Sequence, residues 1–156
     1  VLWGDHGWQL GDHLVWGKHT LFEDALRSTL IIKEPGQEAG VSSSVVSTID
    51  IYPTILELCN IENFVVTDGE SLMPLIDNPH AKNRGFAFSY FRNGISLRTG
   101  RYRLTKYFRG DSTEFELYDL VCDPNESVNI ATWASSTLDS LLVVLDKYGD
   151  TGLYRK

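Results

Sequence analysis

The chain has 156 residues, of which 42% are hydrophobic and 22% are charged. This composition is typical of a folded domain, or of part of a larger one, and argues against a disordered segment. The 14 lysines and arginines stand against 21 aspartates and glutamates, so the formal net charge is −7. Such an acidic balance argues against a general nucleic-acid-binding surface, because neutralising phosphates requires positive charge.

No part of the chain is apolar over the ~20 residues that a membrane-spanning helix needs. Apolar runs such as 30–32 and 141–145 are far shorter. The chain begins with Val1 inside an apolar run, and no signal-peptide pattern precedes it. We therefore expect the true N-terminus of the protein to be missing from this sequence.

The first part of the chain has the short apolar runs and turns of an α/β fold. Residues 1–3 predict the end of a buried strand that leads into a turn, and residues 30–32 predict a second buried strand. Residues 8–20 lack a clean period, so we expect a long ordered loop there. Open α/β sheets bind ligands at the carboxyl ends of their strands, which is where Asp5 and His6 are expected.

The clearest predicted helix begins near Asp50. Asp50 is its expected N-cap, and Pro53 lies in the first turn, where a missing N–H costs little. Apolar residues recur on one face of this helix, and Cys59 lies beside them. Cys59 and Cys122 are the only cysteines, which is too few for a disulfide scaffold. We expect Cys59 to be a buried thiol.

The character of the sequence changes after Pro79. Four strand-like runs follow one another, at residues 86–91, 95–99, 102–107 and 115–120. Turn signals separate these runs, which predicts an antiparallel meander, and residues 133–148 predict a closing helix. We therefore expect two domains: the end of an α/β core over residues 1–80, and a small antiparallel sheet with a helix over residues 84–150.

The residues with the clearest chemical potential lie near the start of the chain. Asp5 and His6 follow a predicted strand, and Lys18 lies in the loop after them. Each has a structural alternative, because an aspartate can cap a turn and a loop lysine can be a solvated charge. These residues alone therefore leave both a ligand site and a structural turn open.

Two other spacings in this region favour structural roles. His6, His13 and His19 are separated by seven and six residues, which matches none of the usual helical ligand spacings and argues against zinc. Glu23 and Arg27 are four residues apart, a spacing that predicts an ion pair on a helix.

Several segments nevertheless form a longer pattern. It begins with the Asp5-His6-Gly7 turn and the Trp16-Gly17-Lys18 element. Further segments follow: Asp50-Ile51-Tyr52-Pro53-Thr54, Gly69-Glu70-Ser71-Leu72-Met73-Pro74-Leu75, Leu97–Leu104, Glu116–Leu120 and Asn129-Ile130-Ala131. Their order resembles the type I sulfatase family, and within it the iduronate-2-sulfatase-like branch. The resemblance implies the C-terminal part of an alkaline-phosphatase-like α/β sandwich, followed by a small antiparallel β-sheet with a C-terminal helix.

The resemblance also implies roles for individual residues in sulfate ester hydrolysis. Asp5 and His6 would be ligands of a divalent cation, usually calcium in this family, although calcium prefers oxygen donors. Lys18 would contact the sulfate and the nucleophile, because a sulfate ester needs positive charge on its non-bridging oxygens as the S–O bond breaks. Trp8 and His13 would line the mouth of the substrate pocket.

One element of the family is absent from this sequence. The sulfatase nucleophile is a formylglycine made from the first residue of a Cys/Ser-x-Pro-x-Arg motif, and neither Cys59 nor Cys122 begins such a motif. The chain therefore resembles a C-terminal portion whose own N-terminal portion would supply the formylglycine and most metal ligands. We expect the chain to be inactive alone and to bind calcium weakly or not at all, because calcium takes roughly six to eight oxygen ligands.

The resemblance implies a sulfated carbohydrate or another sulfate ester as substrate, no nucleic-acid partner, and a periplasmic, extracellular or lysosomal location. Two alternatives stay open. The first is a phosphonate or phosphodiester hydrolase of the same superfamily, which also uses an Asp-His pair after a core strand. The second is a non-catalytic binding or structural domain that keeps the fold, and a Cys/Ser-x-Pro-x-Arg motif upstream would argue against it.

Overall fold

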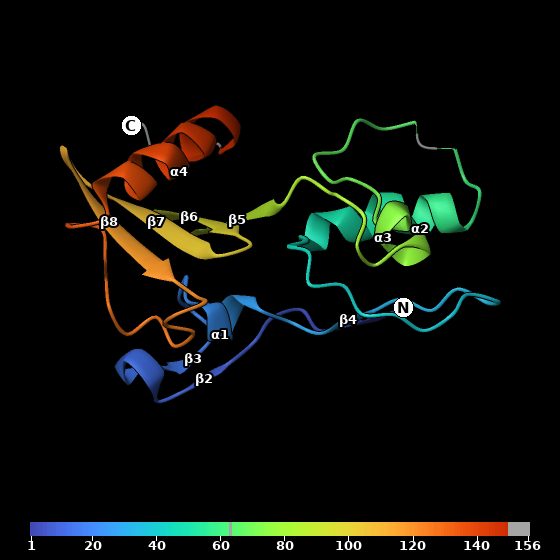
Figure 1. Ribbon diagram of the computed structural model, residues 1–156, viewed down its shortest axis with the longest axis horizontal. Helices are drawn as coiled ribbons and strands as arrows, with labels where there is room; N and C mark the ends of the chain where they lie inside the picture. Colours follow the sequence, from blue (N-terminus) through green and yellow to red (C-terminus); the bar gives the residue numbers. More distant parts are fainter. Residues whose placement is uncertain (63, 150–156) are drawn as a thin grey trace. The chain divides into compact units, whose positions relative to one another are not determined.

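The computed structural model describes residues 1–62 and 64–149 (Figure 1). Its internal contacts divide the chain into two compact units. The first unit comprises Val1–Asp5 and Thr29–Ala87, and the second comprises His6–Ser28 and the residues from Phe88 onward. The domain boundaries expected from the sequence stay a prediction about the whole protein. Within the described residues, no helix is long and apolar enough to cross a membrane.

The first unit contains a two-stranded antiparallel pair formed by β1 (Leu2–Trp3) and β4 (Leu30–Ile31). Strands were predicted at both places, and this is confirmed. The prediction that they are buried is wrong, because Leu2 is 61% exposed and Ile31 is 55% exposed. Strand pairing satisfies only backbone groups, and apolar side chains become buried only where another layer packs on them.

The helices of the first unit are α2 (Ile51–Leu58), which follows a 3-10 turn at Thr48–Asp50, and α3 (Met73–Asp77). Ser47 caps the 3-10 turn, and its own N–H donates to Asp50 Oδ2 at 2.7 Å. Asp50 thus stands at the predicted N-cap position of α2, but its side chain makes no capping hydrogen bond to that helix and instead forms the other half of a reciprocal capping box with Ser47.

Asp50 also links α2 to the rest of the first unit. Its side chain is buried, and its Oδ1 accepts hydrogen bonds from the Glu70 N–H at 3.0 Å and from Arg84 Nη2 at 2.6 Å. Thr54, one turn later, is fully buried, whereas Cys59 is exposed. The prediction of a buried Cys59 thiol is therefore wrong, because α2 turns Thr54 to the interior of this unit.

Most of the second unit is a four-stranded antiparallel sheet in the order β5-β6-β7-β8, with a C-terminal helix. Its elements are β5 (Phe86–Phe91), β6 (Gly94–Thr99), β7 (Tyr102–Arg109), β8 (Ser112–Asp119) and α4 (Ser135–Tyr148). The predicted meander and closing helix are confirmed. Two-residue turns after β5 and β6 keep these strands adjacent, as the alternating sequence pattern requires.

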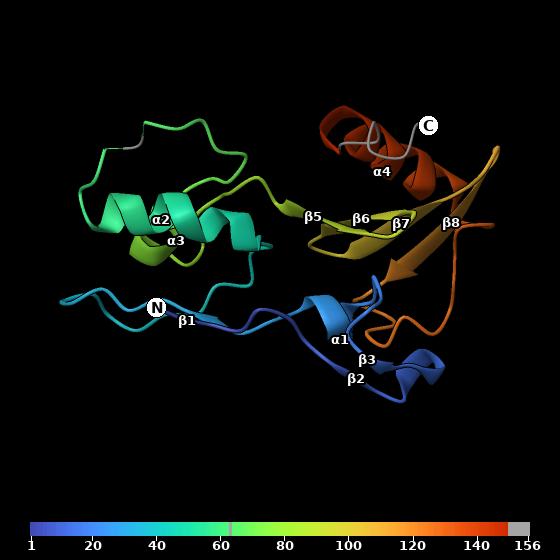
Figure 2. The ribbon, with the colours of Figure 1, turned by 180° about the vertical axis from the view of Figure 1, so that it is seen from behind.

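The two faces of this sheet differ in chemistry. Figures 1 and 2 view the molecule from opposite sides, and both show α4 along one face and α1 (Glu23–Leu26) at the other. Register places fully buried leucines of three strands side by side on one face, at Leu97, Leu104 and Leu117. The opposite face carries polar side chains, including the buried Ser96, Arg103 and Thr105. The second unit therefore has an apolar layer and a polar layer on one sheet.

The ion pair between Arg101 and Asp119 predicts a specific response to acid. Hydrogen bonds from Arg101, the shortest 2.6 Å long, outweigh a small desolvation and lower the pKa of Asp119 to about 2. The carboxylate therefore contributes stability above about pH 4, its ordinary pKa, and this contribution is lost as the pH falls towards 2. In urea unfolding, Asp119→Asn should flatten the loss of stability between these pH values. Asp139→Asn, an exposed control on α4, should behave as the wild type, and identical slopes in all three proteins would contradict this prediction.

Candidate functional site

A small hairpin in the second unit separates His6 and Trp8 from Lys18 along the chain and carries His13. It contains β2 (Gln9–Leu10), a 3-10 turn (Asp12–Leu14) and β3 (Trp16–Gly17), with Gln9 opposite Gly17 and Leu10 opposite Trp16. Gln9 is fully buried and accepts a hydrogen bond from Thr20 Oγ1 at 2.9 Å. The loop predicted for residues 8–20 is thus ordered, and its hairpin returns the chain towards His6.

The hairpin brings His6 and Lys18 together, although they are twelve residues apart. Lys18 Nζ lies 2.6 Å from His6 Nε2, and His6 Nδ1 lies 2.6 Å from the Gly7 carbonyl oxygen. A carbonyl oxygen can only accept, so Nδ1 carries the proton and donates it. Nε2 is then left to accept from the Lys18 ammonium, and the imidazole orients that ammonium.

A close backbone approach supports the turn at Gly7. Its N–H donates to the Ala25 carbonyl oxygen at 2.9 Å. A Cβ at Gly7 would lie 2.0 Å from the Asp24 carbonyl oxygen, which no side chain tolerates. Glycine is therefore required where the chain leaves His6 and passes α1, and any larger residue would displace the loop that holds Lys18.

Asp5 and His6 fall on different sides of the boundary between the units. Asp5 belongs to the first unit and is exposed, whereas His6 belongs to the second and is half-buried. Within residues 1–62 and 64–149, no three His, Cys, Asp or Glu side chains form a group able to hold a metal ion. Asp5 and His6 supply an oxygen and a nitrogen donor, so further ligands for calcium would have to come from elsewhere in the protein.

Trp8 and His13, the predicted substrate-contacting residues, occupy different surroundings. The Trp8 side chain is exposed, and its ring centroid lies 6.0 Å from that of His6. The His13 ring stacks on Phe22, with centroids 3.7 Å apart and planes 2° apart. The structure thus brings Trp8 beside the His6–Lys18 pair and holds His13 against Phe22.

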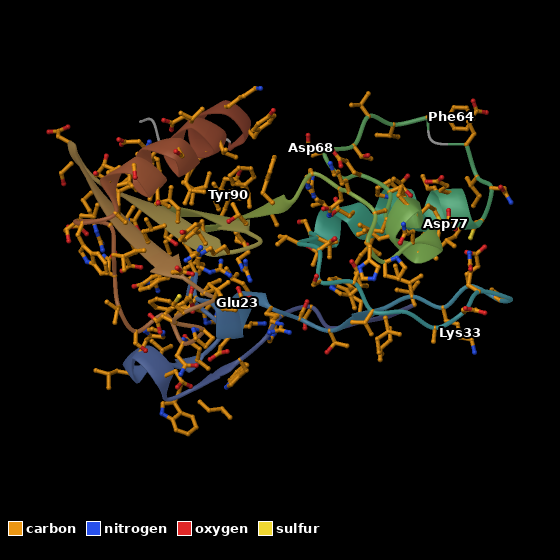
Figure 3. The ribbon with its side chains drawn as sticks, in the orientation of Figure 1. Glu23, Lys33, Phe64, Asp68, Asp77 and Tyr90 are labelled. Carbon is orange, nitrogen blue, oxygen red and sulfur yellow. The ribbon has the colours of Figure 1, made fainter. Side chains whose placement is uncertain are left out.

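The second unit also contains a cluster of four charged side chains, which we call the Glu23 cluster: Glu23, Arg98, Arg103 and Glu126. Figure 3 shows Glu23 on α1 at the polar face of the sheet. Its carboxylate binds Arg103 and also accepts from Arg98 Nε at 3.0 Å. Arg103 Nε in turn lies 2.8 Å from Glu126 Oε1. The predicted Glu23–Arg27 pair is therefore replaced by partners on β6 and β7.

Burial and charge act in opposite directions within the Glu23 cluster. Burial by itself raises the pKa of Glu23, but the hydrogen bond from Arg98 and the charges of Arg103 and Arg98 outweigh it, so the pKa is lowered. For Glu126 burial dominates over the attraction of Arg103, and its pKa is raised. The Glu126 carboxylate also accepts the Glu23 N–H at 2.6 Å, which ties the start of α1 to the loop after β8.

A pocket of about 510 Å³ opens on the second unit beside this cluster. Its lining residues are Phe22, Tyr107, Arg109, Glu114, Phe115, Glu116 and Asn129. Neither this pocket nor the Glu23 cluster was predicted from the sequence. The alternation along the predicted strand does indicate that Arg103, Tyr107 and Arg109 lie on one face of the sheet. It does not indicate which residues they contact, because their partners lie far away in the sequence.

Comparison with known proteins reveals extended sequence similarity. A family model described as N-sulphoglucosamine sulphohydrolase, C-terminal, matches residues 11–141. A sulfatase from Formosa agariphila is 32% identical over 97% of this chain and 30% of its own length. Arylsulfatase K from Mus musculus is 34% identical over 82% of this chain and 26% of its own length. The chain thus spans less than a third of either curated relative.

Solved structures agree with this similarity. The structure of a protein in complex with its substrate D-glucosamine-2-N,6-O-disulfate covers 96% of this chain and 34% of its own chain, with a TM-score of 0.81 and 28% identity. The structure of the phosphonate monoester hydrolase of Agrobacterium radiobacter covers 94% of this chain and 34% of its own chain, with a TM-score of 0.74 and 22% identity. This hydrolase therefore shares the fold of the chain. The predicted fold class and the resemblance to sulfatases are confirmed, and the chain belongs to the type I sulfatase family, of which it is a C-terminal portion.

Proposed function

We propose that the full-length protein is a sulfatase that hydrolyses sulfate esters of carbohydrates, and that this chain supplies part of its active site. The observation that carries the proposal is the contact between Lys18 and His6 in a chain of the sulfatase family. A lone loop lysine would be a solvated charge, whereas this ammonium is half-buried and oriented by an imidazole. It is therefore preorganised to meet an anionic group.

Lys18 would act on the sulfate group of the substrate. As the S–O bond breaks, the negative charge on the non-bridging oxygens of the sulfate needs a positive partner, and a fixed ammonium stabilises that charge without reorganising. His6 would hold the ammonium through Nε2, while the Gly7 carbonyl oxygen fixes the tautomer of the imidazole. Trp8, exposed beside His6, would contact the sugar that carries the sulfate.

Asp5 and His6 would contribute to a divalent cation site that other parts of the protein complete. The carboxylate of Asp5 is the kind of oxygen donor that calcium prefers. The one lone pair of His6, on Nε2, accepts from Lys18, so His6 would have to release Lys18 before it could bind the cation. A bound cation would add Lewis-acid stabilisation of the developing charge and favour an ionised nucleophile. A formylglycine nucleophile and the remaining ligands are proposed to come from the N-terminal portion.

The proposed substrate class is a sulfated sugar. One relative acts as an N-acetylglucosamine-6-O-sulfatase in Bacteroides thetaiotaomicron, and a structural neighbour binds D-glucosamine-2-N,6-O-disulfate. Both support a sulfated hexosamine as the first substrate to test. A periplasmic, extracellular or lysosomal location would suit such a substrate and stays a proposal.

The proposal is tested with the full-length protein on matched substrates. D-Glucosamine 6-sulfate and an aryl sulfate should be hydrolysed, with release of inorganic sulfate as the readout, whereas a phosphonate monoester and a phosphodiester should react more slowly. Faster turnover of the phosphonate would favour the phosphonate hydrolase alternative. No turnover of any ester, despite an upstream Cys/Ser-x-Pro-x-Arg motif and intact folding, would favour a non-catalytic domain.

A further inference from the structure

The pocket on the second unit holds a carboxylate that the fold does not neutralise. Within the described part of the chain, Glu116 accepts one long hydrogen bond, from the Tyr107 hydroxyl at 3.4 Å. Burial raises the pKa of Glu116, and the Tyr107 bond and the charge of His13 oppose this only in part. A carboxylate with one long hydrogen bond keeps further lone pairs that can accept from donors of a ligand.

The other charges of the pocket compensate Glu116 only in part. Among the described residues that line the pocket, Arg109 carries the single guanidinium; its charge lowers the pKa of Glu116, but its Nε pairs with Glu114 Oε2 at 3.2 Å. The lining therefore carries two carboxylates against one guanidinium, and the excess charge is negative. A sulfate group would be repelled here, whereas hydroxyl or amino groups would be attracted.

The pocket also has apolar surface, and its volume is that of a small-molecule site. Phe22 and Tyr107 provide aromatic rings, and each ring has a neighbour against it. The His13 ring stacks on Phe22, and the Arg109 guanidinium lies 5.6 Å from the centroid of the Tyr107 ring. The volume of about 510 Å³ lies within the range of roughly 300–1,000 Å³ that small-molecule sites occupy. Aromatic rings beside carboxylate acceptors suit a sugar ring, which has apolar C–H groups and many donors.

We propose that this pocket is an accessory subsite that binds an unsulfated sugar unit, whose hydroxyl or amino groups donate to Glu116 while its C–H groups pack on Phe22 and Tyr107. The proposal rests on the proposed function in one respect, since it takes a carbohydrate as the ligand class. It goes beyond that function because it adds a second sugar site, which disfavours sulfate and whose lining does not include Lys18. Such a subsite would favour longer, unevenly sulfated saccharides over single sulfated sugars.

The test uses the full-length protein and D-glucosamine as the probe, observed by saturation-transfer difference NMR. Saturable binding in the range of about 1–10 mM is expected for a single sugar. Glu116→Gln removes the charge at nearly constant shape and should weaken binding about tenfold. Asp139→Asn, an equal change of charge at an exposed position of α4, should leave binding unchanged.

Further variants separate this subsite from the catalytic site. Lys18→Ala should abolish sulfate ester hydrolysis and leave D-glucosamine binding unchanged. Loss of D-glucosamine binding in Lys18→Ala, with no effect of Glu116→Gln, would overturn the subsite and leave the proposed function standing. Absence of saturable binding up to about 50 mM, or equal affinity of wild type and Glu116→Gln, would also overturn it. If Glu116→Gln fails to fold by circular dichroism, Glu116→Asp takes its place, with a smaller loss of affinity expected.

Discussion

Replacing Lys18 by alanine in the full-length protein is expected to lower kcat for sulfate ester hydrolysis about 10²–10³-fold. This is the usual loss when one preorganised donor to a developing anion is removed. Folding should be nearly unchanged, because the Lys18 side chain is half-buried in a loop and contributes little packing. Steady-state release of inorganic sulfate measures the effect.

Two further variants test whether the effect is specific to the Lys18 ammonium. Lys18→Arg should restore only part of the activity, because a planar guanidinium does not replace a compact ammonium held by His6 Nε2. Lys33→Ala removes an exposed lysine of the first unit and should be silent. Activity of Lys18→Ala within about threefold of the wild type would show that the lysine is a solvated charge and not a catalytic one.

Replacing Arg103 by methionine is expected to destabilise the chain by about 3–5 kcal/mol. Arg103 is 2% exposed and lies between Glu23 and Glu126, so its removal leaves two carboxylates near each other without their shared cation. Breaking a buried ion pair in this way costs more than the pair contributes, because an uncompensated charge remains buried. Urea unfolding of the full chain at neutral pH measures the loss.

Arg109→Met is the matched control for this prediction, because it makes the same change on the same strand. Arg109 and Glu114 form an ion pair in which both side chains are more than half exposed. Surface pairs of this kind contribute about 0–1 kcal/mol, so Arg109→Met should be nearly neutral for stability. Equal losses in the two variants would mean that the Glu23 cluster is no more stabilising than a surface pair.

The local elements of this chain follow from short-range patterns. The meander from β5 to β8 and the helix α4 were predicted because alternation and helical spacing are properties of neighbouring residues. The helix α2 begins after Asp50, as predicted, but the 3-10 turn at Thr48–Asp50 before it was not predicted, although Ser47 and Asp50 have the spacing of a capping box. That signal was available in the sequence and identifies Ser47 as the cap.

Burial was predicted less well than secondary structure. Leu2, Ile31 and Cys59 lie in apolar stretches, yet all three are exposed in this chain. An apolar pattern shows that an element has a face able to be buried, but it does not show which layer packs on that face. Burial is therefore a property of the assembled layers.

The sequence by itself determined the family, the meander with its closing helix, and the position of Asp5, His6 and Lys18 in one segment. Only the tertiary structure decided which groups meet. In the folded chain Lys18 Nζ contacts His6 Nε2. Glu23 pairs with Arg98 and Arg103 and not with the expected Arg27. Glu116 lies in a pocket with one long hydrogen bond, from Tyr107. The physical reason is that local patterns depend on neighbours in the chain, whereas charge pairing and desolvation depend on distances between segments that only folding brings together.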